Sequence, residues 1–384
     1  MILGGGIAGL WTLARLRQQG YNAVLLETEA LGAGQTRYAQ GIIHGGTKYA
    51  LTGKLTASSE AVSEMPSIWR ACLEGKGEID LQQATLISDA HYLWSTGSLA
   101  SKITGFFASK VMRARTMELE PHERPGIFQH KDFKGNILRL DEPVFDTLSV
   151  LRAIASPIIH AILNIKPGSI SRGPGNIEVD AADGTHYRFS CKKLVLMAGQ
   201  GNADLIQKAG LSAPAMQLRP LKMVMMRGGL SEKVFAHCMG AGINPRITIT
   251  SHTDTMGNIV WYLGGELAEE GVNRSDEEQI AMAKKEVASL IPWQSLDNTE
   301  WAVLDIDRAE VRHPDGHRPD TCYTEQHDNV IVAWPTKLAL APLLAQQIVD
   351  MLEADKVEAT GGELPAWPEA TFADYPWCEE ARWN

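Results

Sequence analysis

Residues 1–27, MILGGGIAGLWTLARLRQQGYNAVLLE, decide the fold. They contain a short apolar strand, a glycine-rich turn, a helix and a second apolar strand that ends at Glu27. The helix is predicted from apolar side chains at helical spacing, namely Ile7, Leu10, Trp11 and Ala14. Gly20 is placed to end it. This order predicts a βαβ unit. Because strands usually run for about 5–6 residues, we expect the numbering to begin inside the first strand.

The turn matches the pattern G-x-G-x-x-G at Gly4, Gly6 and Gly9. Glycines at these places permit a tight turn, close approach of backbone N–H groups to a pyrophosphate, and close packing of the helix on the strand. Ile7 and Ala8 then open the helix, whose N-terminus favours an anion. Glu27 follows Gly9 by 18 residues, where a carboxylate can accept hydrogen bonds from both ribose hydroxyls. The same carboxylate would repel a 2′-phosphate.

The next segment, residues 32–49 (GAGQTRYAQGIIHGGTKY), has neither a helical nor a strand period. It is rich in glycine and carries hydroxyl, amide and imidazole side chains. Its place directly after the ribose carboxylate suits a loop that follows a large cofactor toward its reactive ring. The contacts predicted from this loop are Thr36, Gly41, His44, Gly45 and Gly46.

Two more strand-turn-helix passages lie far along the chain, at residues 194–209 and 330–352. Their turns read AGQGN at residues 198–202 and WPTK at residues 334–337. Three such passages indicate one nucleotide-binding domain assembled from separated segments. The dinucleotide contacts predicted from the two later turns are Ala198, Gly199, Gly201, Thr336, Lys337 and Leu338.

Together these segments resemble the D-amino-acid-oxidase superfamily of flavoenzymes, and are most similar to glycerol-3-phosphate dehydrogenases and L-2-hydroxyglutarate oxidases. The likeness lies in GQT at 34–36, QGIIHGGTKY at 40–49 and the turns at 198–202 and 335–338. At residues 335–336 the chain has Pro-Thr where glycerol-3-phosphate dehydrogenases have Gly-Gly, so the backbone there is expected to differ. The resemblance covers most of the nucleotide-binding domain and implies FAD as the cofactor, expected to bind non-covalently.

The expected fold class is α/β, with a Rossmann-like FAD-binding domain built from discontinuous segments and an α+β substrate domain with an antiparallel sheet. We assign residues 1–58, 142–217 and 302–384 to the FAD-binding domain, and residues 59–141 and 218–301 to the substrate domain. A capping box at residues 275–278 predicts a helix to about Leu290. The tail from Leu364 is expected to form an irregular arm on the surface.

Lys337 and His44 are candidate catalytic residues. A cation at the start of a helix opposes the macrodipole, but beside a flavin a lysine would stabilise negative charge that arrives with a hydride. The alternative is a solvated lysine. His44 is expected to act as a proton acceptor or a hydrogen-bonding spacer. The alternative is that it is a buried histidine with a structural role. His313 is a second candidate for the base.

Arg308 and Arg312 lie where the related enzymes carry an arginine that clamps the anionic group of the substrate. An arginine fork binds carboxylate or phosphate in a bidentate manner. The four-residue spacing does not tell which of the two faces the site. The alternative is a surface ion pair with Glu310 or Asp307.

Composition limits the other functions. A net charge of −10 without a basic block argues against nucleic-acid binding. The five cysteines form no CxxC pair, so no metal site is predicted and a reducing, cytoplasmic location is expected. No apolar run reaches 18 residues. Residues 102–115 mix aromatic and basic side chains, which is typical either of an ordinary amphipathic helix or of peripheral contact with the inner membrane face.

The sequence therefore predicts an FAD-dependent dehydrogenase or oxidase that takes a hydride from a CH–OH or CH–NH group of a small anionic substrate to flavin N5. Molecular oxygen or a quinone would accept the electrons. One alternative is an amine or amino-acid oxidase on the same scaffold. A second is a flavin-binding partner protein without turnover. The sequence does not specify the substrate, the acceptor or the oligomeric state.

Overall fold

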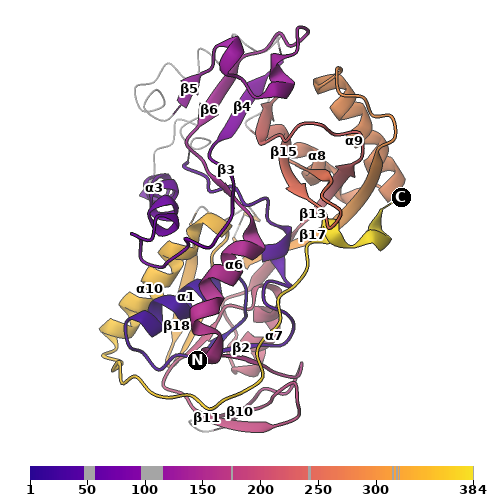
Figure 1. Ribbon diagram of the computed structural model, residues 1–384. Coiled ribbons are helices and arrows are strands. Elements are labelled where there is room, and N and C mark those ends of the chain that lie inside the picture. Colours follow the sequence, from indigo (N-terminus) through magenta and orange to yellow (C-terminus); the bar gives the residue numbers. More distant parts are fainter. Residues whose placement is uncertain are drawn as a thin grey trace.

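Two large sheets organise the protein, as the computed structural model shows (Figure 1). The structure describes residues 1–46, 57–96, 116–173, 176–240, 244–313, 315–316, 319 and 321–383. A six-stranded sheet has the order β18-β19-β12-β1-β2-β8, and an eight-stranded sheet has the order β17-β13-β16-β15-β14-β4-β6-β5. Residues 102–115, the proposed membrane-contact segment, lie outside the described residues.

The six-stranded sheet is parallel except at its β18 edge. Ile2 and Leu3 of β1 point to opposite faces, because successive side chains in a strand alternate. Ile2 joins the core beneath α1, α6 and α10, and Leu3 joins a second core toward α7 and the β9-β10-β11 sheet. Burial on both faces explains why the central strands β1, β12 and β19 are uniformly apolar, whereas the edge strand β18 (YTEQH) is mostly polar. The strands are β1 (Ile2–Leu3), β2 (Leu25–Glu27), β8 (Ile162–Asn164), β12 (Leu194–Leu196), β18 (Tyr323–His327) and β19 (Val330–Trp334).

The predicted helices of this domain are present. Helix α1 (Ile7–Gln18) is followed by Gly20 in the left-handed conformation (φ 83°), as the sequence predicted. The other helices are α6 (Thr147–Ala155), α7 (Asn202–Lys208) and α10 (Ala341–Ala354). The small outer sheet consists of β9 (Ser171–Gly173), β10 (Asn176–Asp180) and β11 (His186–Ser190).

The eight-stranded sheet is built around β13 (Met216–Arg227), which pairs over its full length with β17 (Glu300–Val311). Strand β17 was expected in the FAD-binding segment from residue 302, and this expectation was wrong, because its pairing places it in the second sheet. Helix α9 (Asp276–Leu290) begins at the predicted capping box. The remaining elements are β4 (His91–Ser95), β5 (Thr116–Glu118), β6 (Ile137–Leu140), β14 (Ala236–Met239), β15 (Pro245–Thr253), β16 (Ile259–Gly264) and α8 (Glu266–Glu270).

Helix α3 (Ala57–Leu73) also departs from the expected division. It falls in the segment assigned to the substrate domain, yet Met65 and Trp69 are buried in the same core as α1 and α10. The Trp69 Nε1–H donates to the carbonyl of Ala339 (3.0 Å). The short strand β3 (Leu86–Ser88) pairs with β7 (Val144–Phe145). Segment 59–141 thus contributes to both cores, and of its described elements β4, β5 and β6 lie in the eight-stranded sheet.

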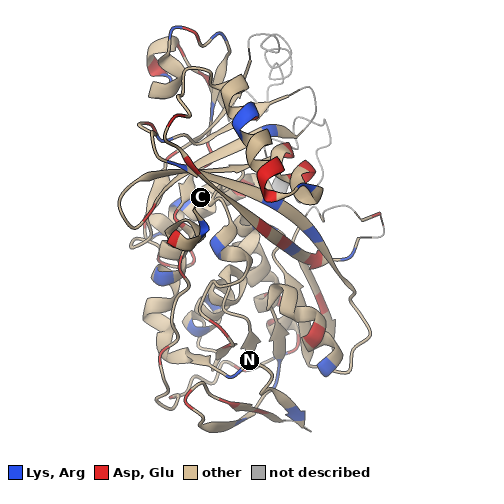
Figure 2. Cartoon of the chain, turned by 90° about the vertical axis from the view of Figure 1, so that its right-hand side faces the viewer, with Lys and Arg blue, Asp and Glu red and all other residues tan. Residues whose placement is uncertain are grey.

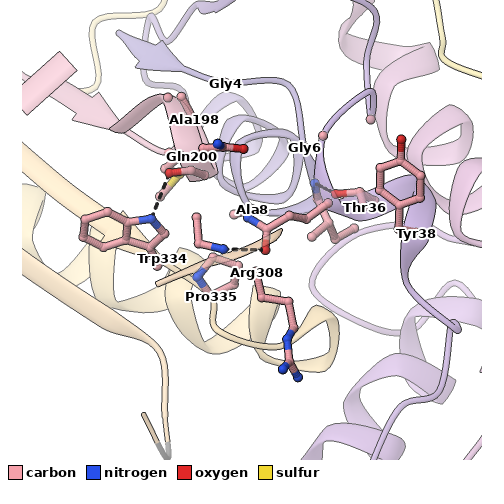
Figure 3. A pocket seen from close by; sticks show the side chains of 18 of the residues that line it. Gly4, Gly6, Ala8, Thr36, Tyr38, Ala198, Gln200, Arg308, Trp334 and Pro335 are labelled. Carbon is pink, nitrogen blue, oxygen red and sulfur yellow. Dashed lines mark hydrogen bonds between the residues drawn. The ribbon is translucent and has the colours of Figure 1, made fainter. Parts of the chain in front are cut away.

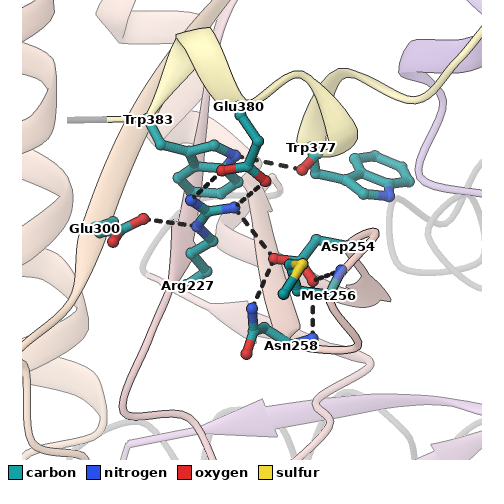
Figure 4. Close-up of polar contacts among 8 residues, drawn as sticks. All are labelled: Arg227, Asp254, Met256, Asn258, Glu300, Trp377, Glu380 and Trp383. Carbon is teal, nitrogen blue, oxygen red and sulfur yellow. Dashed lines mark hydrogen bonds and ion pairs between the residues drawn. The ribbon is translucent and has the colours of Figure 1, made fainter.

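The C-terminal arm crosses from one sheet to the other (Figure 1). Near its start, Leu31 exchanges backbone hydrogen bonds with Thr371 and Ala373 (2.7 and 3.0 Å). Near its end, Glu380 forms an ion pair with Arg227 of β13 (2.7 Å; Figure 4). Arg227 also binds further carboxylates and lies under a tryptophan ring, with the partners Asp254, Glu300 and Trp383. The expected irregular arm is therefore tied to both domains.

Charges of both signs alternate on the face shown in Figure 2. Among the helices that the structure describes, none combines the length and apolar character needed to cross a membrane.

Candidate active site

A cavity of about 950 Å³ lies between the two sheets. It is at the upper end of the range of about 300–1,000 Å³ for ligand pockets. One side is formed by the turns that follow β1, β2, β12 and β19, and the other by β13 and β17. Ligands of open α/β sheets bind at this end of the strands.

The three motif glycines have two different roles. At Gly4 (φ 114°) a Cβ would lie 2.6 Å from the carbonyl oxygen of Met197, and at Gly9 it would lie 1.9 Å from that of Gly4. These two glycines are thus required by backbone packing. At Gly6 a Cβ would meet Thr36 Oγ1 at 3.2 Å and no other described atom within 4 Å, and Gly6 lines the cavity. Gly6 therefore keeps space for the ligand.

The N-terminus of α1 faces this space. The Ile7 N–H donates to Thr36 Oγ1 (3.1 Å), which holds the predicted loop against the helix (Figure 3). Helix α1 lies wholly within the described residues and has no acidic side chain in its first turn. Ile7, Ala8 and Thr36 all line the cavity. The positive end of the helix dipole is thus directed at a place suited to a pyrophosphate.

Glu27 lines the cavity and also fixes the backbone around it. Its carboxylate accepts hydrogen bonds from the N–H groups of Gly5, Thr28 and Glu29 (2.5, 2.7 and 3.0 Å). A carboxylate has about four acceptor positions. The Thr28 hydroxyl also approaches Oε1 (3.4 Å), whereas Oε2 has the Gly5 N–H as its one donor among the described residues, so Oε2 is the oxygen with room for a ribose hydroxyl. Glu27 therefore joins the glycine turn to the end of β2.

Glu27→Gln is expected to weaken FAD binding by about 1–3 kcal/mol, the range for losing a charged hydrogen bond. The affinity is measured by titrating apoprotein with FAD and following the quenching of flavin fluorescence. Glu363→Gln, in the exposed C-terminal segment, is the control and should bind as the wild type does. Equal affinity of the Glu27 variant would remove this residue from the cofactor site.

The turn predicted to make the second dinucleotide contact is held by Asn202, which is fully buried. Its Oδ1 accepts from the Ala198 N–H (2.8 Å), and its Nδ2 donates to the carbonyls of Leu196 and Ala333 (3.2 and 3.1 Å). This side chain ties the ends of β12 and β19 together. The Trp334 Nε1–H donates to the Gly199 carbonyl (3.0 Å; Figure 3). The predicted residues Ala198, Gly199 and Gly201 all line the cavity.

Thr336 and Lys337 follow β19 at the same cavity. Thr336 adopts the left-handed conformation (φ 58°), which is costly for a β-branched residue. Lys337 is buried, with 9% of its surface exposed. It precedes a short 3₁₀ helix, Leu338–Leu340, so it does not lie in the first turn of α10. Lys337 is therefore a buried lysine that lines the cavity, and its position relative to the macrodipole of α10 differs from the one expected.

Arg308 of β17 lines the cavity (Figure 3). Its Nε–H donates to the Arg219 carbonyl (3.2 Å), and its guanidinium lies 3.9 Å from a carboxylate oxygen of Glu269. Arg312 follows the end of β17 and is absent from the described residues that line the cavity.

His44 lines the cavity and is paired with Glu142, a residue that the sequence did not single out. His44 Nδ1 lies 3.0 Å from Glu142 Oε2, and the Gly45 N–H donates to Glu142 Oε1 (2.9 Å). Burial tends to raise the pKa of Glu142, but the hydrogen bond and charge of His44 keep this pKa below its usual value. An ionised Glu142 accepts the Nδ1 proton and leaves Nε2 of His44 as an acceptor.

The cavity brings together most, but not all, of the predicted site residues. Gly41, with φ 75°, and Leu338 also line it. Absent from its described lining are Gly9, Gly45, Gly46 and Arg312. His313 lies outside it as well, 3.8 Å from a carboxylate oxygen of Asp315. Lining residues that the sequence did not single out include Gln35, Tyr38, Gln40, Met223, Glu269 and Trp334.

The cavity thus joins a glycine turn and a helix N-terminus, features of a dinucleotide site, to a second, largely antiparallel sheet. The chain belongs to the FAD dependent oxidoreductase (DAO) family, whose model matches residues 1–351. It is an FAD-dependent oxidoreductase, and the predicted family, cofactor and fold class are confirmed.

The probable FAD-dependent oxidoreductase PA4991 of Pseudomonas aeruginosa is 44% identical over 382 residues, which cover 98% of this chain and 96% of that protein. Its crystal structure aligns with a TM-score of 0.84 at 39% identity, over 98% and 96% of the two chains.

Two more distant structures share the fold. Glycine oxidase from Geobacillus kaustophilus aligns with a TM-score of 0.63 at 15% identity, over 92% of this chain and 94% of that one. L-α-glycerophosphate oxidase from Mycoplasma pneumoniae, solved with FAD bound, aligns with a TM-score of 0.61 at 12% identity, over 98% and 97%.

Proposed function

We propose that the protein oxidises a CH–OH group of a small anionic substrate by hydride transfer to N5 of FAD. The observation that carries this proposal is Arg308, a guanidinium on the substrate sheet that lines the same cavity as the glycine turn. When bound, FAD supplies the acceptor of two electrons. The residues of the chain supply substrate binding, orientation and proton transfer.

Arg308 is assigned to the anionic group of the substrate. Its Nε is held by the Arg219 carbonyl (3.2 Å), which orients the guanidinium. Within the described residues, a carboxylate oxygen of Glu269 lies 3.9 Å from the guanidinium, and the Glu269 side chain is 43% exposed, so this ion pair is long and weak. A substrate carboxylate or phosphate can bind two N–H groups side by side and replace this weaker contact.

His44 is assigned to the proton of the substrate hydroxyl. Glu142 holds Nδ1 of His44 (3.0 Å) and fixes the tautomer whose Nε2 can accept a proton. The buried carboxylate also stabilises the imidazolium that then forms. Lys337, buried beside the same cavity, is assigned to the negative charge that accumulates on the cofactor.

A CH–NH substrate is the second candidate, because the glycine oxidase of Geobacillus kaustophilus shares the fold. A panel of anaerobic reductions separates the two. The holoenzyme is mixed with 2-hydroxy acids, glycerol 3-phosphate, amino acids and secondary amines, and loss of the visible flavin absorption is followed. Reduction by a hydroxy acid or sugar phosphate supports the proposal, and reduction by amines alone overturns it. Bleaching by none of them would favour a binding protein without turnover.

Molecular oxygen or a quinone is proposed as the electron acceptor, in a cytoplasmic protein that contacts the inner membrane face in the quinone case. An oxygen electrode distinguishes the two, because turnover that consumes no oxygen but reduces a soluble quinone supports the second.

Arg308→Met is expected to lower kcat/KM for the anionic substrate by about 10–150-fold, mainly through KM. Losing a charged hydrogen bond costs about 1.5–3 kcal/mol, and about 1.4 kcal/mol corresponds to tenfold. Arg312→Met is the matched control, since Arg312 does not belong to the described lining of the cavity. Steady-state kinetics with the substrate found in the panel test this, and a larger loss for Arg312→Met would reverse the assignment.

A further inference from the structure

We propose that His44, Glu142 and His237 form a binding site for a divalent transition-metal ion such as Zn²⁺, and that an ion bound there switches off the proton acceptor His44. One ligand atom from each of the three residues lies within 4.8 Å of the other two. The second half of this proposal, the switch, rests on the proposed function of His44. The first half, binding, does not.

The three side chains have the chemistry of a zinc site. Two imidazoles and one carboxylate are a known ligand set for Zn²⁺, with bonds of about 2.0–2.2 Å. Ligand atoms around one such ion are at most about 4 Å apart, so the ion would draw the three together slightly. Glu142 is 3% exposed, whereas the His44 side chain is 42% exposed, which gives an ion a path from the cavity.

Second contacts hold two of the three ligands in place, as is usual in metal sites. Glu142 Oε1 accepts from the Gly45 N–H (2.9 Å), so Oε2 is the oxygen turned toward His44. Nδ1 of His237 lies 2.8 Å from Thr248 Oγ1, a hydroxyl that can accept the Nδ1 proton and leave Nε2 as the ligand. These contacts fix the orientation of the carboxylate and of one imidazole before an ion arrives.

A third histidine, His91, gives a second, independent sign that this cluster serves a polar ligand. His91 is fully buried, and neither of its ring nitrogens makes a hydrogen bond of normal geometry to a described residue. Its ring centroid lies 4.1 Å from that of His237, which lies 5.7 Å from that of His44. Burying an imidazole without partners is costly. A metal ion with its bound water would offer His91 a partner beside His237.

A bound ion is expected to affect catalysis because it changes which ring nitrogen of His44 carries the proton. In the neutral tautomer held by Glu142, Nδ1 of His44 carries the proton and Nε2 accepts one. An ion on Nδ1 requires this proton to move to Nε2, since a neutral imidazole carries one N–H. Nε2 then donates a hydrogen bond and can no longer accept the substrate proton. No net proton is released by His44, and no redox change is involved.

The test is equilibrium dialysis of the untagged holoenzyme against Zn²⁺, with metal counted per FAD. The wild type should retain one Zn²⁺ per chain, and Glu142→Gln and His237→Gln should each bind at least about tenfold more weakly, since even outer-shell changes cost 10–100-fold. His186→Gln is the control. It removes another histidine with Nδ1 close to a carboxylate (2.9 Å from Asp180), but this pair lies exposed on β10 and β11.

Absence of stoichiometric Zn²⁺ from the wild type, or equal binding by both variants, overturns the site. FAD content checks that each variant is folded. The switch is tested separately by adding Zn²⁺ during anaerobic reduction with the substrate. Flavin reduction should slow over the same concentration range as binding. Stoichiometric binding without slower reduction would keep the site and refute the switch, and with it the role of His44 as acceptor.

Discussion

Gly6→Val is expected to give a folded, colourless protein that retains no FAD. A Cβ at Gly6 meets Thr36 Oγ1 at 3.2 Å and is otherwise clear of described atoms, so the backbone can accept the change. The branched side chain would instead fill the space between the N-terminus of α1 and the cavity. The pyrophosphate would lose its approach to the backbone N–H groups there.

Absorption spectra and FAD released on denaturation measure this loss, and circular dichroism reports the fold. Gly173→Val is the matched control, because its Cβ would meet no described atom within 4 Å and the residue ends β9, away from the cavity. Gly9→Val should behave differently from both, since its Cβ would lie 1.9 Å from a backbone oxygen and disrupt folding itself. A yellow Gly6→Val protein with one FAD per chain would contradict the site.

Lys337→Met is expected to lower the reduction potential of the bound flavin by about 30–60 mV and to slow its reduction by substrate. The lysine charge favours the reduced, anionic cofactor over the oxidised, neutral one, so its removal acts on the difference between the two states. A charged interaction of about 1.5–3 kcal/mol corresponds to this shift, because 30 mV equals about 1.4 kcal/mol for two electrons. FAD should remain bound.

A redox titration against a reference dye measures the potential, and sulfite titration gives a second reading. The sulfite adduct also places negative charge on the flavin, so its affinity should fall in Lys337→Met. Lys76→Met serves as the control, since the Lys76 side chain is 76% exposed and lies beside Glu74 at the surface. Wild-type potential and sulfite affinity in the Lys337 variant would place this ammonium away from the ring.

The nucleotide site could be predicted from the sequence because it depends on local backbone geometry. Gly4 and Gly9 are needed where backbone atoms nearly touch, and such a need leaves a pattern within a few residues. The family resemblance then identified FAD as the dinucleotide. The predicted domain boundary at residue 302 was wrong because it depends on long-range strand pairing, which leaves no local pattern. Strand β17 has the same alternating side chains whichever sheet it joins, and its partner β13 lies some 80 residues earlier.

The histidine cluster shows a second limit. His44, His91, Glu142 and His237 come from four distant segments, and no spacing in the sequence connects them. Of the four, His44 alone lies in a recognisable motif. A long-range cluster of this kind becomes visible when β4 and β14 pair in parallel, which brings the strands that carry His91 and His237 side by side.

The order of strands in the six-stranded sheet determines when this sheet can form during protein synthesis. β1 is synthesised first, yet its neighbour β12 and the next strand β19 emerge from the ribosome about 190 and 330 residues later. The arm that ties Leu31 to Thr371 and Arg227 to Glu380 emerges last. Domains generally fold as units during synthesis. Here the nucleotide-binding sheet cannot be completed until β19 has emerged, and the arm that attaches it to the second domain follows later still. The apolar strand β1 therefore waits for its neighbour β12 through about 190 residues of synthesis.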